Sequence, residues 1–200
     1  MKEDCPFCES FRKKNFDEFE ISRIPVKKSR TIYSDYDTGI VAVLEPEQKT
    51  VGYALVIPRA HINGIADPKL DQCDFNAVMR VCNLVAKAQM HAFGSDVERV
   101  HIASMGEGQQ HLHFHVMPRY RLEDKEKDYF LDQPNHMKPP FSEEPIDPDK
   151  IKGGFWYWGY QELEWRQKKP RTEEEAGKLG DEIEDTFRTL KSEIEKLTRV

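Results

Sequence analysis

The chain has 200 residues, of which 38% are hydrophobic and 33% are charged, and its formal net charge at pH 7 is −6. A chain of this length can bury one substantial core, so we expect one catalytic body with or without an appendage. The acidic balance argues against a nucleic-acid-binding protein, because phosphate-backbone binding depends on clustered Lys and Arg.

The apolar segments of the chain bear on where the protein is located in the cell. The N-terminus begins Met1-Lys2-Glu3-Asp4 and has no apolar stretch of signal-peptide length. No segment approaches the roughly 20 apolar residues of a membrane span. Four cysteines are too few for a disulfide scaffold in a chain of this size. We therefore expect a soluble cytoplasmic protein with no membrane partner.

The first motif is a cysteine pair, Cys5-Pro6-Phe7-Cys8, whose spacing is typical of metal sites and of redox-active thiols. Redox pairs of this kind follow a strand and open a helix, and only four residues precede Cys5. The position therefore favours a metal site. Structural zinc takes four Cys and His ligands, so such a site needs two more.

A hairpin and a buried strand are predicted next. Residues 31–33 and 40–44 are rich in β-forming side chains and flank a turn-forming segment, residues 35–39. Residues 53–57 form an almost continuous apolar run that Pro58 stops. Such a run predicts a central strand that is covered on both faces.

Residues 71–94 predict an amphipathic helix of about six turns, because apolar side chains recur there at helical spacing. Asp71 fits the start of this helix and Gly94 fits its end. Cys73 and Cys82 fall within the helical pattern and are predicted to be small core residues.

Two more strands, residues 97–104 and 112–117, complete an α+β body, and the run from His111 to Val116 carries the alternating histidines His111, His113 and His115 on the second. Successive side chains of a strand point to opposite faces, so three imidazoles share one face at a spacing of roughly 7 Å. A neutral imidazole is a competent nucleophile near neutral pH, and neighbouring histidines can differ in protonation. One ring can attack phosphorus while another donates, which gives a phosphohistidine intermediate. A purely structural role is the weaker alternative.

The character of the chain changes beyond Tyr120. Residues 121–152 are rich in Pro, Asp, Glu and Lys and predict an arm without a core of its own. An aromatic run follows at residues 155–160, for which packing is favoured over stacking on a base. Thr172 and Glu175 fit a capping box. The last helix then carries a narrow apolar stripe that can dock on the body or pair with another helix: Ile183, Phe187, Leu190, Ile194 and Leu197.

The segment from His111 to Met117 resembles the signature of the histidine-triad family, in which three histidines alternate with apolar residues. The cysteine pair, the Leu-Val-Ile-Pro strand with His61 after it, and the long helix also resemble this family. The resemblance covers residues 1–122, taken as the catalytic domain. It leaves a charged and aromatic arm at residues 123–170 and a C-terminal amphipathic helix at residues 171–200.

This resemblance implies an α+β histidine-triad fold, with an antiparallel sheet packed by a long helix. It also implies a homodimer that acts on nucleotides, namely nucleoside monophosphate esters, anhydrides or phosphoramidates. The family's nucleophile corresponds to His113. The histidine that contacts the phosphate or leaving group corresponds to His115, and the carboxylate that holds the ribose hydroxyls corresponds to Glu45. For Glu45, a solvated strand end is an equally good interpretation.

Two departures from the family pattern concern the nucleotide side of the site. The loop before the triad resembles a shorter version, in which Gly108 can let backbone N–H groups approach a phosphate and Gln109 or Gln110 can donate a hydrogen bond. Many members have a histidine ahead of the Leu-Val-Ile-Pro run, where this chain has Tyr53. A histidine partner for the catalytic strand is therefore missing or replaced.

The resemblance also completes the metal site. Members that carry the N-terminal cysteine pair use the histidine after Ile-Pro and the first histidine of the triad as further ligands. The implied cofactor is a structural zinc held by Cys5, Cys8, His61 and His111, which leaves His113 and His115 for chemistry. The alternative is a frayed cysteine pair beside an ordinary loop histidine.

Three functions remain open at this point. The leading hypothesis is a hydrolase that cleaves a nucleoside phosphoramidate or a dinucleoside polyphosphate through a nucleotidyl-histidine intermediate. A nucleotidyltransferase or phosphorylase would use the same residues with a different second acceptor. A zinc-stabilised nucleotide-binding or interaction module without turnover is the alternative from another class.

Overall fold

The computed structural model describes residues 4–13, 30–35, 37–45, 48, 50–104, 110–120 and 172–199. Within these ranges it contains the helices α1 (Pro6–Lys13), α2 (Gln72–Phe93) and α5 (Glu173–Thr198), and a short 3-10 turn at Gly94–Asp96. The expected arm at residues 123–170, the aromatic run within it, and Gly108 and Gln109 lie outside the described residues.

Five antiparallel strands form one sheet, in the spatial order β1-β2-β3-β5-β4. Their bounds are β1 Thr31–Asp35, β2 Ile40–Leu44, β3 Ala54–Pro58, β4 Val97–Ala103 and β5 Phe114–Tyr120. The predicted hairpin is confirmed, since Asp35 pairs with Ile40 across the turn. The predicted apolar strand is also confirmed: β3 is the third of five strands and all five of its residues are buried.

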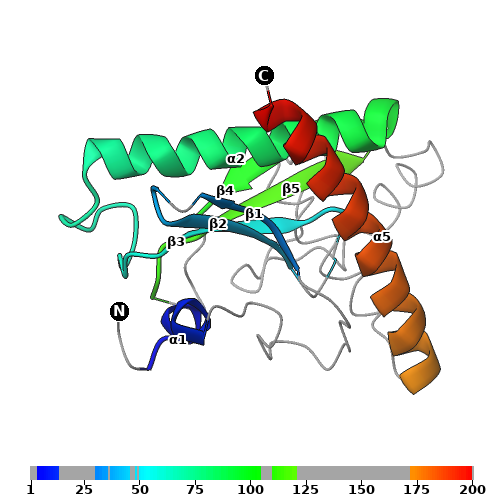
Figure 1. Cartoon of the computed structure of the whole chain (residues 1–200), viewed down its shortest axis with the longest axis horizontal. Helices are drawn as coiled ribbons and strands as arrows, with labels where there is room; N and C mark the ends of the chain where they lie inside the picture. Colours follow the sequence, from blue (N-terminus) through cyan, green and yellow to red (C-terminus); the bar gives the residue numbers. More distant parts are fainter. Residues whose placement is uncertain are drawn as a thin grey trace, which may run out of the picture.

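Helices cover both faces of the sheet. Helix α2 runs along one face of the sheet, and α5 packs at an angle to α2, in contact with α2 and β1. The short α1 lies on the opposite side of the sheet (Figure 1). Alternate residues of β2 divide between the two faces, since Ala42 and Leu44 belong to the core under α2 whereas Val41 and Val43 belong to the cluster beside α1. The α+β class with an antiparallel sheet and a long helix is confirmed.

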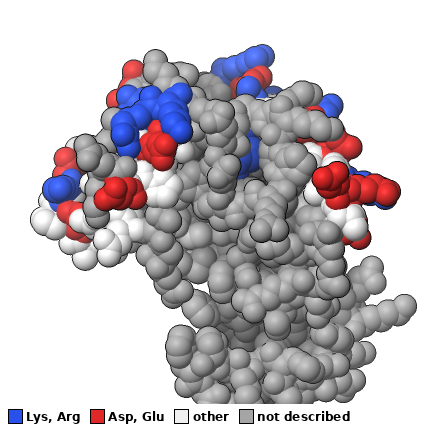
Figure 2. Space-filling model, turned by 90° about the horizontal axis from the view of Figure 1, so that it is seen from below, with Lys and Arg blue, Asp and Glu red and all other residues white. Residues whose placement is uncertain are grey.

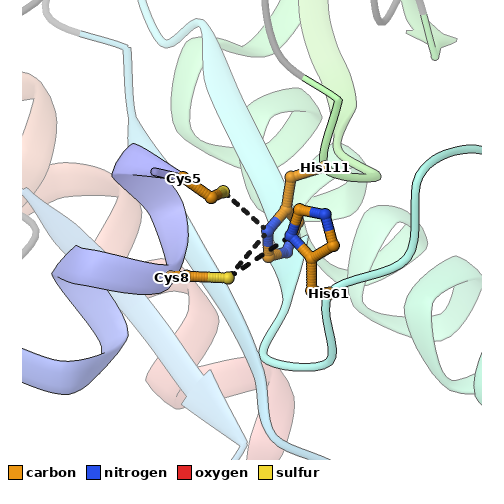
Figure 3. Close-up of side chains that lie close together, drawn as sticks. All are labelled: Cys5, Cys8, His61 and His111. Carbon is orange, nitrogen blue, oxygen red and sulfur yellow. Dashed lines mark hydrogen bonds between the residues drawn. The ribbon is translucent and has the colours of Figure 1, made fainter. Parts of the chain in front are cut away.

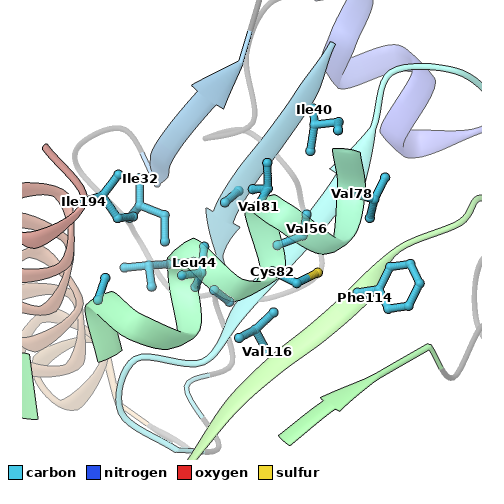
Figure 4. Close-up of a cluster of buried hydrophobic side chains, with 14 of the residues drawn as sticks. Ile32, Ile40, Leu44, Val56, Val78, Val81, Cys82, Phe114, Val116 and Ile194 are labelled. Carbon is cyan, nitrogen blue, oxygen red and sulfur yellow. The ribbon is translucent and has the colours of Figure 1, made fainter. Parts of the chain in front are cut away.

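The main core lies between the sheet and the α2 and α5 helices, as Figure 4 shows. Residues of strands β2, β3 and β5 point into it, and Val81, Cys82 and Val85 of α2 meet them. Leu112, Phe114 and Val116 all lie in this core, so the expected alternation between apolar and histidine residues holds across residues 111–116. Their burial fixes the segment that presents the histidines on the other face.

Helix α2 has the start and end that the sequence predicts. The Asp71 side chain accepts a hydrogen bond from the backbone N–H of Asp74, at a distance of 2.8 Å, and caps the N-terminus. At the other end Gly94 takes a φ of 58°, a left-handed conformation that glycine adopts without a Cβ penalty. The 22-residue length agrees with the expected six turns.

Helix α5 docks on the body through its apolar stripe. Its capping box is formed, because the Thr172 side chain and the Glu175 side chain each bond to the other residue's backbone N–H. The stripe packs into the main core beside α2 and β1: Ile183, Leu190 and Ile194 are buried, and Phe187 and Leu197 are partly buried. Of the two expected modes, docking on the body is the one observed.

Two sequence-based expectations need correction, and one helix was not expected. Cys82 is buried in the core as predicted, but Cys73 is exposed in the first turn of α2. Strand β5 begins at Phe114, so His111 and His113 lie in the irregular segment ahead of the strand. Residues 6–13 form a helix that the sequence analysis did not predict.

Charged side chains of both signs are mixed on the described surface. On the face drawn in Figure 2, the described Lys and Arg side chains, including a group of adjoining ones, lie directly beside Asp and Glu side chains. Glu98 forms ion pairs with both Arg99 and Arg119. Among the described helices, none combines the length and the apolar character needed to cross a bilayer.

Candidate active site and metal centre

The site lies on the face of the sheet that α1 covers. Phe7 of α1 packs against the rings of His111 and His113, with centroid distances of 5.5 and 5.2 Å. The rings of His113 and His115 are 4.8 Å apart. The three histidines therefore share one face, as predicted, although only His115 lies within a strand.

Four potential metal ligands converge at one end of this face. Cys5 and Cys8 come from the start of α1, His61 from the loop after β3 and His111 from the segment before β5 (Figure 3). Their ligand atoms all lie within 4.8 Å of one another. Sequence reasoning named all four residues, and the fold brings them together.

The sulfur–nitrogen distances within this cluster fit the tetrahedral coordination of a zinc ion. Nδ1 of His111 lies 3.3 Å from Sγ of Cys5 and 3.6 Å from Sγ of Cys8, and Nδ1 of His61 lies 3.4 Å from Sγ of Cys8. Zinc bonds of about 2.3 Å to sulfur and about 2.0–2.1 Å to nitrogen place tetrahedral S and N ligands about 3.6 Å apart. The observed separations are close to that value, so the donor set fits in both chemistry and size.

The ring of His111 is oriented by a second contact. Its Nε2 donates a hydrogen bond of 2.8 Å to the backbone carbonyl of Pro58, which leaves Nδ1 as the lone-pair nitrogen facing the sulfurs. Burial lowers the pKa of His111 to about 4, so the imidazole is neutral, as a metal ligand must be. Burial also raises the pKa of the Cys5 thiol, which a bound cation would counteract.

His113 is buried, and one of its nitrogens has a defined partner. Its Nδ1 lies 2.7 Å from the backbone carbonyl oxygen of His111. A carbonyl can only accept, so Nδ1 carries the hydrogen and Nε2 of the neutral ring carries the lone pair. Burial lowers the pKa of His113, while the bond to the carbonyl acts in the opposite direction. The neutral, nucleophilic form is thereby favoured.

His115 has Tyr53 as its partner. The Tyr53 hydroxyl is hydrogen-bonded to Nδ1 of His115, and the two rings lie 5.7 Å apart. From the sequence, a histidine partner for this strand is either missing or replaced. Tyr53 occupies that place in this chain.

The candidate nucleotide-binding residues have different surroundings. Glu45 is only 8% exposed, which excludes the interpretation of a solvated strand end, and its backbone N–H bonds to the carbonyl of Tyr53. Gln110 is exposed at the start of the histidine segment. Gly108 and Gln109 lie outside the described part of the chain, so their placement stays a prediction.

Sequence reasoning missed two residues that support this face. Phe7, which packs on two of the histidines, was treated only as a spacer between cysteines. Gln89 is fully buried in α2 and bonds to the carbonyls of Gly52 and Val116. Its signal was present, because a Gln four residues after Val85 interrupts the apolar face of the predicted helix.

Comparison with known proteins agrees with this geometry. The HIT domain family model matches residues 25–122. An uncharacterized HIT-like protein of Borreliella burgdorferi is 31% identical over 102 residues, which cover 48% of this chain and 72% of that protein. The protein Hit of Bacillus subtilis is 28% identical over 86 residues, which cover 42% of this chain and 59% of that protein.

Among solved structures, a zinc-bound histidine triad family protein from Mycobacterium smegmatis shares the fold. Its TM-score is 0.54 at 18% sequence identity, with 98% of this chain and 96% of that chain covered. The alternating histidines, the sheet with its long helix, and the similarity over most of the Borreliella relative lead to the same conclusion. This chain belongs to the histidine triad (HIT) family.

Proposed function

We propose that this protein is a nucleotide-processing hydrolase that cleaves a nucleoside phosphoramidate or a dinucleoside polyphosphate through a nucleotidyl-histidine intermediate. One observation carries the proposal, namely the hydrogen bond from Nδ1 of His113 to the carbonyl of His111. It presents a buried imidazole with its lone pair on Nε2, the form that can attack phosphorus.

In the proposed first step, the Nε2 lone pair of His113 forms a bond to the α-phosphorus of the nucleotide. The bond from phosphorus to the leaving group breaks, and its electron pair departs with the leaving group, whose nitrogen takes up a proton from solvent when the substrate is a phosphoramidate. In the second step a water oxygen attacks phosphorus, the N–P bond breaks and its electron pair returns to Nε2. Nucleoside monophosphate is released, and the proton lost by the water passes to solvent. His115 is the proposed contact to the phosphate.

The proposal includes a structural zinc held by Cys5, Cys8, His61 and His111. It is supported by the Cys and His donor set and by S–N separations of 3.3–3.6 Å. When bound, zinc would fix the start of α1 to the loop after β3 and to the histidine segment. The four ligands would complete the coordination of zinc and leave no open position on it for a reacting group. The proposed chemistry is therefore assigned to His113 and His115.

The remaining parts of the proposal concern nucleotide binding and assembly. The buried Glu45 would hold the ribose hydroxyls, and backbone N–H groups near Gly108, with the side chains of Gln109 and Gln110, would bind the phosphates. We also propose that the protein assembles as a homodimer. Residues 1–122 would form the catalytic domain, with residues 123–170 as an arm and residues 171–200 as an added helix.

Product analysis tests this function. The protein is incubated with a labelled nucleoside phosphoramidate or a dinucleoside polyphosphate, with and without inorganic phosphate. Nucleoside monophosphate as the product in both conditions supports the hydrolase. Nucleoside diphosphate formed only with phosphate would instead indicate a phosphorylase, and binding without turnover would indicate a non-catalytic module. Quenching without acid should trap an acid-labile nucleotidyl group on His113.

A further inference from the structure

The buried Tyr53 and the partly buried His115 form a hydrogen-bonded pair next to the proposed nucleophile. Strands β3 and β5 are in register with Leu55 opposite His115, so Tyr53 is the diagonal neighbour of His115 on the same face of the sheet. The Tyr53 side chain is only 3% exposed, and its hydroxyl bonds to Nδ1 of His115. Tyr53 is thus placed to act on His115 rather than on solvent.

The backbone on both sides of this pair is fixed by one side chain. Nε2 of Gln89 donates hydrogen bonds of 2.8 Å to the carbonyl of Gly52 and 3.1 Å to the carbonyl of Val116. Gly52 directly precedes Tyr53, and Val116 directly follows His115. Gln89 is itself fully buried beneath the sheet, so the two chain segments that carry the pair are tied to the same point of α2.

The direction of the Tyr53–His115 bond follows from the acidity of its partners. A phenolic hydroxyl can donate or accept, and a neutral imidazole has one donor and one acceptor nitrogen. As a class, phenols are stronger acids than neutral imidazole N–H groups, and imidazole nitrogens are stronger bases than phenol oxygens. The hydrogen of the pair therefore belongs to the oxygen, and Nδ1 of His115 accepts it.

We propose that Tyr53 is a positioning residue that sets His115 in the tautomer opposite to that of His113. His113 carries its hydrogen on Nδ1, bonded to the His111 carbonyl, and keeps its lone pair on Nε2. His115 accepts at Nδ1 and carries its hydrogen on Nε2. Two rings 4.8 Å apart then present a nucleophile and a hydrogen-bond donor to the same phosphate. The catalytic part of this inference rests on the proposed function, whereas the tautomers do not.

Nitrogen-15 NMR of the histidine rings tests the tautomers without any substrate. In the zinc-loaded full chain, at a pH where both rings are neutral, long-range spectra should show an unprotonated Nε2 in His113 and an unprotonated Nδ1 in His115. Tyr53→Phe removes only the hydroxyl and should shift His115 toward a mixture of tautomers, with His113 unchanged. Wild-type spectra that place the His115 hydrogen on Nδ1 would overturn the proposal, even if the variant failed to fold.

Tyr120→Phe is the matched control. Tyr120 lies on β5, the strand of His115, and its hydroxyl donates a hydrogen bond to the Val51 carbonyl and not to His115. This variant should leave both tautomers as in the wild type. Under turnover, Tyr53→Phe should lower kcat by about 10- to 100-fold with little change in KM, as expected for loss of a partner that orients a ring nitrogen. An unchanged kcat, or an equal loss in Tyr120→Phe, would contradict the positioning role.

Discussion

The backbone carbonyl oxygen of His111 lies 2.7 Å from Nδ1 of His113, so a single hydrogen bond joins the group of four potential metal ligands to the proposed nucleophile. The imidazole of His111 faces Cys5 and Cys8, while its main chain holds the next imidazole of the triad. A displacement of His111 at the cluster therefore changes the support of His113 directly. Loss of the metal should affect turnover as well as stability.

The first prediction concerns the metal. Purified protein should contain roughly one zinc per chain, and Cys8→Ser should lose it. The free energy of unfolding should fall by roughly 2–5 kcal/mol, as for the loss of a structural cross-link, and turnover should fall at temperatures well below the melting point. Metal analysis and thermal melting measure the outcome. Cys73→Ser is the control, since Cys73 is exposed, and an equal effect there would refute the assignment.

The second prediction concerns the nucleophile. His113→Asn should reduce kcat by about three orders of magnitude or more, because the proposed covalent intermediate cannot form. The melting temperature and zinc content should stay near those of the wild type, and His115→Ala should be less severe. His91→Asn changes an exposed histidine on α2 and should keep full activity. Near-normal turnover in His113→Asn would falsify the mechanism.

The third prediction concerns the docking of α5. Leu190 is fully buried between α5 and the body, so Leu190→Ala should lower the free energy of unfolding by roughly 2–5 kcal/mol. Ser192→Ala, on an exposed position of the same helix, should change it by less than about 0.5 kcal/mol. A chain ending at Arg171 should expose apolar surface and melt earlier. A truncated protein with unchanged melting behaviour and solubility would show that this packing is dispensable.

The fourth prediction compares two glycines. Gly52 has a φ of 86°, and a Cβ there would lie 2.6 Å from the Phe93 ring, so Gly52→Ala should destabilise the fold by roughly 1–3 kcal/mol. Gly177 lies in α5 with open space around it, so Gly177→Ala should stabilise the fold by about 0.5–1 kcal/mol. Chemical denaturation of both variants decides the matter, and effects of the same sign would contradict the argument.

Elements with strong local signals were predictable from the sequence. Asp71 and Gly94 mark the two ends of α2, and the capping box at Thr172 marks the start of α5. Helix α1 was missed because eight residues are too few for a periodic pattern to stand out. Cys73 was placed in the core wrongly, although nine residues on a helix turn through about 180°, so Cys73 and Cys82 lie on opposite faces.

The site was predictable in its residues but not in its hydrogen bonds. The three histidines and the cysteine pair stand out because alternating imidazoles and a close thiol pair are uncommon patterns. The Tyr53–His115 contact depends on how β3 and β5 are aligned, and no local feature of either strand specifies that register. The same holds for Gln89, whose two acceptors come from separate segments.

The ligand cluster joins chain segments that are made far apart in time. Sγ of Cys8 and Nδ1 of His111 are in contact across 103 residues. At typical synthesis rates, roughly 5–20 s pass between the addition of these two residues to a nascent chain. During that interval the thiols have no His111 beside them, so they are open to oxidation before the cluster can close. The cluster can therefore form only from thiols that stay reduced until His111 has been made.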